Sequence, residues 1–234
     1  MKKREVSNLE TCWLYDQCNH KDCDKDFCLR KYKMDSLYSA ALMTESQKKH
    51  VVLRVDADNT DLEQFRQLAA IEKDIVKFVS EGKNLYIYST NCGNGKTSWS
   101  LRLAQAYFNK IWPKASLTCK ALFINVPKFL LTLKDNISNK SNYITYIKEN
   151  ILKADIVIWD DISHHISTDY EITNLLSLID ARITCGKSNI YTSNCAPREL
   201  ASCLDARLAS RIANLSTVIM LQGADKRVLA QKQS

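Results

Sequence analysis

The pattern of apolar positions along the chain changes near residue 62. Beyond that point, short apolar runs typical of buried strands alternate with segments whose apolar residues recur at helical spacing. We expect strands at 84–88, 121–125, 154–159, 187–192 and 217–221. We expect helices at 62–79, 98–110, 127–133, 171–182 and 205–212. This alternation predicts an α/β domain.

The residues before 62 are organised differently. A helical pattern spans 29–38, and the polar stretch 45–60 that follows is where we place a domain boundary. The predicted organisation is a Cys-rich module with a connecting helix, then a linker, then the larger domain, with the bounds 1–45, 46–61 and 62–234.

A glycine-containing loop follows the strand expected at 84–88. Its core is Gly-Asn-Gly-Lys-Thr at 93–97, and Thr90 stands where a phosphate-binding loop usually has its first glycine. In such a loop the glycines let backbone N–H groups face an anion, and the positive end of the next helix adds to the attraction. Lys96 then reaches the β- and γ-phosphates, and the Thr97 hydroxyl binds Mg²⁺. The strand, loop and helix together predict a nucleotide phosphate site.

Polar side chains end two further expected strands. Asp160 and Asp161 close the apolar run that starts at 154, and Asn194 follows the run at 187–192. Asp160 is expected to hold Mg²⁺, and Asp161 to orient or deprotonate an attacking water. Asn194 is a candidate to sense the γ-phosphate or position that water. Its alternative role is to cap the helix that starts near Pro197.

Two arginines, Arg207 and Arg211, lie four residues apart on one face of the helix expected at 205–212. They could pair with acidic neighbours or reach into the nucleotide of a neighbouring subunit. Few residues follow Leu221, so we expect no sizeable helical lid after the last strand.

Four of the nine cysteines lie close together near the amino end, with one histidine among them: Cys12, Cys18, His20, Cys23 and Cys28. This polar segment can bury little apolar surface, and Zn²⁺ held by four of the five side chains would stabilise it as a tetrahedral structural site. The spacing Cys-x5-Cys-x4-Cys-x4-Cys differs from the paired Cys-x2-Cys of a zinc ribbon. Free thiols in a small helical module and an iron–sulfur cluster are the alternatives.

Composition and charge narrow the class of protein. Hydrophobic residues make up 45% of the chain and charged residues 25%, as in ordinary globular proteins. The net charge is +7, and most of the excess lies in residues 181–234, where a phosphate-contacting surface is expected. No apolar run approaches the length of a bilayer span or of a signal peptide, so we expect a cytoplasmic protein with reduced thiols.

Four motifs follow one another in order: G-N-G-K-T, I-V-I-W-D-D-I, Y-T-S-N and A-R-L-A-S-R-I. Over about residues 62–234 they resemble the AAA+ ATPases of the DnaC/DnaI replicative helicase-loader type, bacterial or phage, and the related IstB-type ATPases. The double Asp, the missing lid and the Cys-rich amino-terminal module are similar to the loaders. The resemblance implies an α/β P-loop NTPase of AAA+ type with a parallel central sheet flanked by helices. It also implies that no sizeable C-terminal lid is present and that a small Cys-rich zinc-binding module precedes the ATPase domain.

The resemblance also implies residue roles. Nucleotide is expected to contact Gly93, Asn94, Gly95, Lys96, Thr97, Ser98, Asp160 and Arg227. Mg²⁺ is expected to contact Thr97 and Asp160. The catalytic residues implied are Asp161, Asn194 as sensor 1 and Arg211 as an arginine finger. Arg207 is the weaker finger candidate, and Arg227 would serve as a sensor 2 arginine.

The activity that the resemblance implies is a weak, Mg-dependent ATPase coupled to loading of a replicative hexameric helicase onto single-stranded DNA. The expected cofactors are ATP, Mg²⁺ and Zn²⁺, and the expected partners are the helicase, single-stranded DNA and further copies of the chain through Arg211. The alternatives are an IstB-like transposition ATPase and an adaptor that holds nucleotide with little hydrolysis. Lys96, Asp160 and Asp161 favour hydrolysis, and the compact Cys-rich module favours docking to a helicase.

Overall fold

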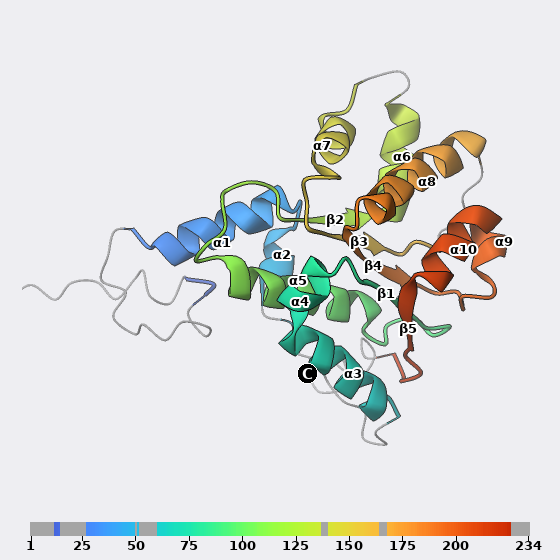
Figure 1. Cartoon of the computed structure of the whole chain (residues 1–234), viewed down its shortest axis with the longest axis horizontal. Helices are drawn as coiled ribbons and strands as arrows, with labels where there is room; N and C mark the ends of the chain where they lie inside the picture. The colour runs from blue at the N-terminus through green and yellow to red at the C-terminus, as the bar shows by residue number, and fades with distance from the viewer. Residues whose placement is uncertain are drawn as a thin grey trace, which may run out of the picture.

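Five parallel strands form the central sheet of the computed structural model, which describes residues 12–14, 27–49, 51, 60–136, 140–163 and 168–225 (Figure 1). The strands are β1 (Asn84–Tyr88), β2 (Ala121–Asn125), β3 (Ile156–Asp160), β4 (Ser188–Ser193) and β5 (Ser216–Met220). Their order in the sheet is β2-β3-β4-β1-β5, and every neighbouring pair is parallel. Each strand lies within two residues of the range that the apolar pattern predicts.

The strand register brings the polar strand ends together. Asn125 lies beside Asp160, and Tyr88 lies beside Ser193. The carboxyl ends of β1, β3 and β4 therefore meet at one edge of the sheet, where ligands of parallel α/β sheets bind.

Ten helices accompany the sheet in the described part of the chain. They are α1 (Leu29–Ala40), α2 (Glu45–Lys48), α3 (Leu62–Lys73), α4 (Ile75–Ser80), α5 (Lys96–Ile111), α6 (Val126–Asp135), α7 (Asn142–Asn150), α8 (Asp169–Thr184), α9 (Leu200–Cys203) and α10 (Ala206–Asn214). The apolar pattern at 62–79 corresponds to two helices, because Asp74 has non-helical dihedral angles (φ −109°, ψ 27°) and caps both α3 and α4.

Side-chain caps fix where three of the helices near the site begin. The Asn125 side chain accepts a hydrogen bond from the N–H of Lys128, and Pro127 lies in the first turn of α6. Thr168 and Glu171 form a capping box at α8, and Asp205 caps α10.

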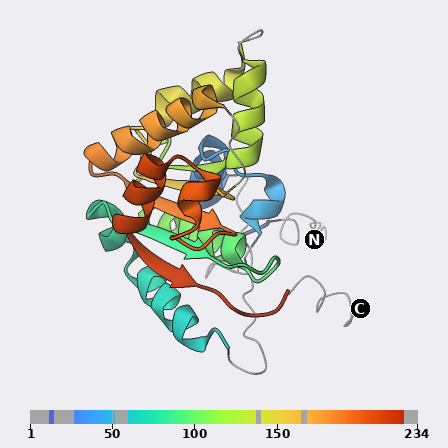
Figure 2. The same ribbon diagram turned by 90° about the vertical axis from the view of Figure 1, so that its right-hand side faces the viewer.

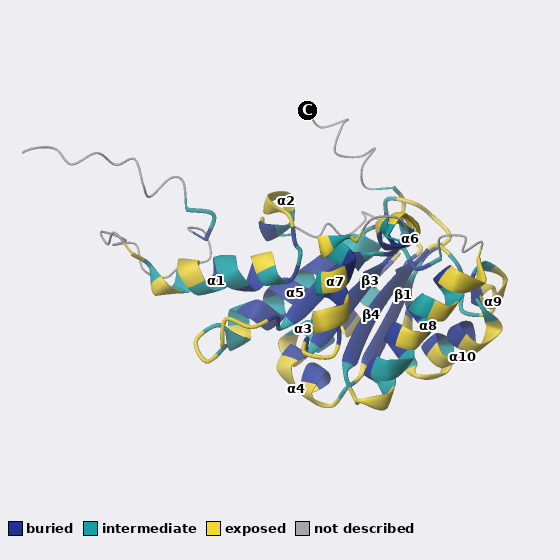
Figure 3. Cartoon of the chain, turned by 90° about the horizontal axis from the view of Figure 1, so that it is seen from above, coloured by how far each residue is buried: buried dark blue, intermediate teal, exposed yellow. Residues whose placement is uncertain are grey.

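Helices cover both faces of the sheet (Figure 2), and the apolar core has two layers, one on each face. Because side chains alternate along a strand, Leu85 and Ile87 of β1 face one layer and Tyr86 faces the other. The first layer holds apolar residues of α1, α3, α4 and α5, and the second holds those of α6 to α10. Seen from above, β3 and β4 are buried along their length (Figure 3), β1 and β2 are buried at all but their last residue, and the edge strand β5 has exposed residues.

Helix α1 packs against the sheet domain. Met34, Leu37 and Tyr38 are buried in the first layer, and the ring of Tyr38 meets Phe108 of α5 edge-on at 5.0 Å. The N–H of Phe123 in β2 also donates a 2.8 Å hydrogen bond to the carbonyl of Ala41. The division into 1–45, 46–61 and 62–234 stays a prediction, but residues of α1 share the apolar core of the larger domain.

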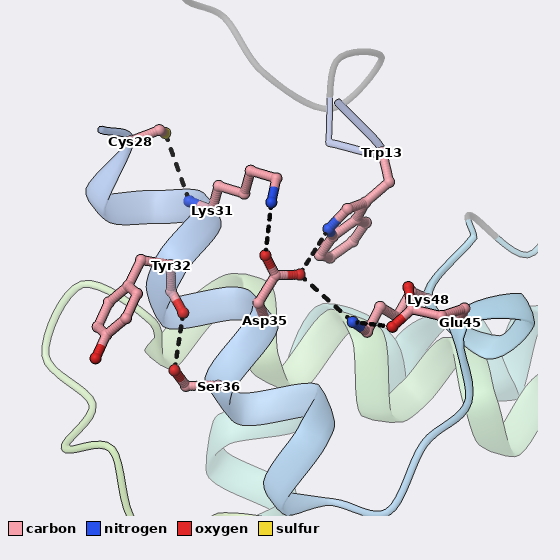
Figure 4. Close-up of polar contacts among 8 residues, drawn as sticks. All are labelled: Trp13, Cys28, Lys31, Tyr32, Asp35, Ser36, Glu45 and Lys48. Carbon is pink, nitrogen blue, oxygen red and sulfur yellow. Dashed lines mark hydrogen bonds and ion pairs between the residues drawn. The ribbon is translucent and has the colours of Figure 1, made fainter. Parts of the chain in front are cut away.

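A polar cluster fixes the outer face of α1 (Figure 4). The Asp35 carboxylate accepts hydrogen bonds from Lys31 Nζ at 2.9 Å, from Trp13 Nε1 at 2.9 Å and from Lys48 Nζ at 3.5 Å. Burial raises the pKa of Asp35, but these donors outweigh burial and hold the pKa below its usual value. Asp35 thereby links α1 to the segment at 12–14 and to α2.

A buried arginine stabilises the amino ends of β3 and β4, opposite the carboxyl ends that form the site. The Arg182 guanidinium is fully buried and donates to Asn189 Oδ1 at 2.8 Å and to the carbonyls of Ala154 and Ser188 at 2.9 and 2.5 Å. Burial lowers its pKa to about 10, so the group stays charged at neutral pH. Arg182 thus joins α8 to the starts of β3 and β4.

None of the helices within the described ranges is long and apolar enough to cross a membrane.

Candidate nucleotide site

The loop at 89–95 connects β1 to α5 and has a backbone that only glycine adopts readily at two positions. Gly93 has φ +70° and Gly95 has φ +103°. A side chain at Gly93 would also overlap the carboxylate of Asp225. Gly95 caps α5, so the loop turns directly into the helix whose positive end favours an anion.

Lys96 begins α5 and lies over its own loop. Its Nζ donates to the carbonyl of Asn91 at 2.9 Å and to Asn94 Oδ1 at 3.3 Å. Asn94 is fully buried, and its amide donates to Ser89 Oγ and to the carbonyl of Leu221 at 3.1 Å. The Asn94 side chain braces the loop from within, and its contact with nucleotide stays a prediction.

Asp160 lies at the centre of the site. The hydroxyls of Thr97 and Thr192 each donate a 2.8 Å hydrogen bond to its Oδ1. Burial raises the pKa of Asp160, and the hydrogen bonds from Thr97, Thr192 and Asn125 oppose that rise. The structure therefore brings together Thr97 and Asp160, the two residues predicted to bind Mg²⁺. A hydroxyl and a carboxylate are oxygen donors of the kind that Mg²⁺ accepts beside nucleotide phosphates.

Asp161 has an unusual backbone conformation for a residue with a side chain. Its φ is +58°, and its N–H donates a 2.9 Å hydrogen bond to Thr192 Oγ1. Its carboxylate accepts a 3.3 Å hydrogen bond from Asn194 Nδ2, and the N–H of Asn194 donates to Ser163 Oγ at 2.9 Å. Left-handed backbone at a non-glycine residue is strained and is found disproportionately at functional sites. The ends of β3 and β4 are thus joined through the two predicted catalytic residues.

Thr192 is a residue that the motif analysis missed. It is buried at the end of β4, where its hydroxyl donates to Asp160 and accepts from the backbone of Asp161. The signal was present in Y-T-S-N, because a hydroxyl at the carboxyl end of a buried strand faces the same edge as the aspartates.

Asp61 is a second missed residue. Its carboxylate is buried and accepts 2.7 and 2.9 Å hydrogen bonds from the N–H groups of Gln222 and Gly223. The carbonyl of Gln222 accepts from Asn91, at 3.2 Å, and the preceding carbonyl accepts from Asn94. Asp61 therefore holds the segment after β5 against the phosphate loop. No helix follows β5 before the described residues end at 225.

The two arginines of α10 pair with acidic groups of their own chain. Arg211 Nη1 contacts Asp180 of α8, and Arg207 Nε lies 3.3 Å from Asp205 Oδ1. Both arginine side chains reach the surface. Their roles toward a neighbouring subunit stay predictions, and Arg227 lies outside the described residues.

Only part of the predicted zinc cluster is described. Cys12 and Cys28 are described as free thiols, and Cys28 Sγ accepts from the N–H of Lys31 at 3.5 Å at the start of α1. Cys18, His20 and Cys23 lie outside the described residues. Across the ranges that are described, no group of three or more His, Cys, Asp or Glu side chains could hold a metal ion.

Comparisons with known proteins agree with this architecture. The family model of the bacterial DnaA ATPase domain matches residues 63–218. No curated protein matches the chain. A solved structure of the DnaC helicase loader is 18% identical with a TM-score of 0.57, and the match covers 69% of this chain and 90% of that one. Domain III of Thermotoga maritima DnaA is 22% identical with a TM-score of 0.59, and the match covers 76% of this chain and 70% of that one. DnaI is 21% identical with a TM-score of 0.53, and the match covers 78% of this chain and 92% of that one.

At these identities, the three structures show a shared fold. The matches confirm the AAA+ resemblance that the four motifs predict, together with its parallel five-stranded sheet flanked by helices.

Proposed function

The chain belongs to the family of the bacterial DnaA ATPase domain, and from this premise we propose that it is an ATP-dependent DNA replication protein that loads a replicative hexameric helicase onto single-stranded DNA. The family supports nucleotide hydrolysis in a replication-related AAA+ protein. The helicase, the DNA and the coupling between them are parts of the proposal.

One observation carries the proposal that the site hydrolyses ATP. The edge of the sheet where β1, β3 and β4 end holds two separate pairs, Thr97 with Asp160 and Asp161 with Asn194. The first pair offers ligands for a metal on the nucleotide. The second pair lies just beyond the ends of β3 and β4, and its contact is separate from that of Thr97, which suits it to an attacking water. A protein that only holds nucleotide has no need of the second pair.

The chemistry follows from this arrangement. The loop N–H groups and Lys96 would bind the β- and γ-phosphates, with Lys96 exchanging its contacts to loop carbonyls for phosphate oxygens. A Mg²⁺ ion bound to Thr97 and Asp160 would neutralise charge on the phosphates. Asp161 would orient or deprotonate the water, and Asn194 would hold Asp161 and sense the γ-phosphate.

We assign helicase docking to residues 1–45. This segment carries the cysteine cluster, and we propose that four of Cys12, Cys18, His20, Cys23 and Cys28 hold one structural Zn²⁺. Metal analysis of purified full-length protein should find about one zinc per chain. Purified protein that contains no zinc, and whose folding does not change on treatment with a chelator, would contradict the assignment.

The proposed function is tested by capture of its partner. Purified chain, with ATP and Mg²⁺, is incubated with the replicative hexameric helicase of its host, and complexes are separated by size. We expect a stable complex, and ATP hydrolysis that changes when single-stranded DNA is added. Failure to bind the helicase, together with binding to a DNA-bound recombinase, would favour the transposition-type ATPase instead.

A further inference from the structure

Two cysteines outside the predicted zinc cluster lie against each other beside the candidate site. Cys195 lies two residues after the end of β4, and Cys203 is the last residue of α9. Their Sγ atoms are 2.9 Å apart, and both side chains are half-buried. The sulfur atoms of a disulfide are about 2.05 Å apart, so the two thiols need to approach by less than about 1 Å to bond.

The backbone around the pair is held in place. The hydroxyl of Tyr86 donates a 2.8 Å hydrogen bond to the carbonyl of Cys195, and the N–H of Cys195 donates to Ser193 Oγ at 3.0 Å. The carbonyl of Leu200 accepts from the N–H of Leu204 at the end of α9. Two thiols held this close by fixed backbone are arranged for reaction with each other.

We propose that Cys195 and Cys203 form a reversible disulfide that makes this chain sensitive to thiol oxidants. The two thiols become one S–S bond and release two protons. The two electrons reduce a small disulfide of the glutathione class to two thiols, so the step is balanced. In a reducing compartment such bonds are transient and act as redox sensors more often than as structural links.

The exchange takes two steps at the pair. Burial, and the hydrogen bond and charge of Cys203, raise the pKa of Cys195 to about 11. The thiolate of either cysteine attacks the small disulfide, forms a mixed disulfide and releases one small thiol. The other cysteine, whose Sγ lies 2.9 Å away, then displaces the second small thiol.

A metal site is the other chemistry open to two thiols, and the surroundings do not favour it. In the described residues these thiols are not part of any group of three or more metal-ligating side chains. Nearby polar groups include the hydroxyls of Ser163, Ser193 and Ser202 and the carboxylate of Glu199, and Glu199 does not complete a metal-ligating group with the two thiols.

The bond would act on the candidate site. Asn194 precedes Cys195, and α9 packs against α10, which carries Arg211 (Figure 1). A disulfide would fix the distance between the end of β4 and α9, and with it the elements that carry the predicted sensor and finger residues. This effect on rate rests on the proposed function, whereas formation of the bond does not. We expect oxidation to lower ATP turnover several-fold and dithiothreitol to restore it.

The test uses the trypsin cleavage site at Arg198, which lies between the two cysteines. Full-length protein is reduced, freed of reductant, incubated with oxidised glutathione, alkylated and digested. Cleavage after Lys187, Arg198 and Arg207 places the two cysteines in separate peptides, 188–198 and 199–207. We expect these peptides to appear joined, with two hydrogens fewer than their sum, and to separate with dithiothreitol. Separate, alkylated peptides after oxidation would overturn the proposal.

Two variants and two internal controls sharpen the test. Cys195→Ser and Cys203→Ser should each abolish the joined peptides, and the remaining cysteine should keep glutathione because no second thiol displaces it. The exposed Cys92 and Cys185 lie in other tryptic peptides, and neither should join peptide 188–198 or 199–207. Joining of either to those peptides would show unselective oxidation and overturn the proposal. A disulfide that forms without changing ATP turnover, in protein that hydrolyses ATP when reduced, would overturn the switch.

Discussion

The side-chain amide of Asn194 donates a 3.3 Å hydrogen bond to the carboxylate of Asp161, across the ends of two neighbouring strands. Asp161 reaches this position through a left-handed backbone, held by the hydroxyl of Thr192. The contact places the residue predicted to act on water beside the residue predicted to sense phosphate. Asp160 makes a different contact, because its Oδ1 accepts from Thr97. This division of the two aspartates leads to a direct test.

Lys96→Ala and Asp161→Asn should fail at different steps. Lys96 is the only cationic side chain between residues 89 and 98. Its loss removes a charge-assisted phosphate contact of about 1.5–3 kcal/mol, which weakens ATP binding roughly 10- to 100-fold. Asp161→Asn keeps Thr97 and Asp160, and Asn tolerates the left-handed backbone. We expect near wild-type ATP affinity with hydrolysis lowered by about 10²-fold or more.

Fluorescent-nucleotide titration and single-turnover hydrolysis measure the two steps separately. Asn194→Ala is a second variant of the hydrolysis pair, and it should lower hydrolysis while leaving ATP affinity intact. An equal loss of ATP affinity in the Lys96 and Asp161 variants would show that the two residues do not divide binding from hydrolysis.

The hydroxyl of Thr192 should contribute to both the stability of the fold and the rate of ATP hydrolysis. Thr192→Val removes the acceptor of the Asp161 N–H and leaves the buried Asp160 with one hydroxyl donor fewer, at a cost of about 1–3 kcal/mol. We expect a lower melting temperature and slower hydrolysis. Thr192→Ser keeps the hydroxyl and should retain most of the hydrolysis. Thermal melts and ATPase rates decide the matter, and equal rates for the two variants would exclude a role for the hydroxyl.

The strands and the phosphate loop could be predicted from the sequence because they depend on local signals. Apolar runs mark strands, and Gly93 and Gly95 mark a loop with positive φ. The hydroxyl of Thr192 at a strand end was such a signal, whereas Asp61 could not be predicted from local signals. Asp61 contacts Gln222 and Gly223 at the far end of the chain, and only the folded sheet brings these segments together. Pairing of Arg211 with Asp180 likewise depends on how α8 and α10 pack.

Arg211→Ala and Asp180→Ala should separate an arginine finger from a surface ion pair. Both substitutions break the same contact, which is partly exposed and of a kind worth about 0–1 kcal/mol. Both variants should therefore melt close to wild type. If Arg211 completes a neighbour's site, Arg211→Ala should also lower ATP hydrolysis in the assembled state, by up to about 10³-fold, while Asp180→Ala keeps it.

Mixing experiments complete the test of Arg211. Subunits carrying Arg211→Ala are combined with subunits carrying Lys96→Ala, so that some interfaces pair an intact Lys96 with an intact Arg211. Partial recovery of hydrolysis is the expected result. If no ratio restores activity although assembly is intact, Arg211 acts within its own subunit or only braces α10.

Two tyrosines of α1 form a matched pair that tests whether this helix belongs to the core of the ATPase domain. Tyr38 is 1% exposed and packs on Phe108 of α5, whereas Tyr32, six residues earlier, is 49% exposed. Removing a buried aromatic ring costs about 3–5 kcal/mol, and a substitution at the surface changes stability by less than about 0.5 kcal/mol. Tyr38→Ala should therefore lower the melting temperature of the nucleotide-binding domain by many degrees, and Tyr32→Ala should not. Melting followed with bound fluorescent nucleotide reports on that domain directly. If both variants melt like wild type, α1 belongs with the amino-terminal module and can be removed without loss of the nucleotide site.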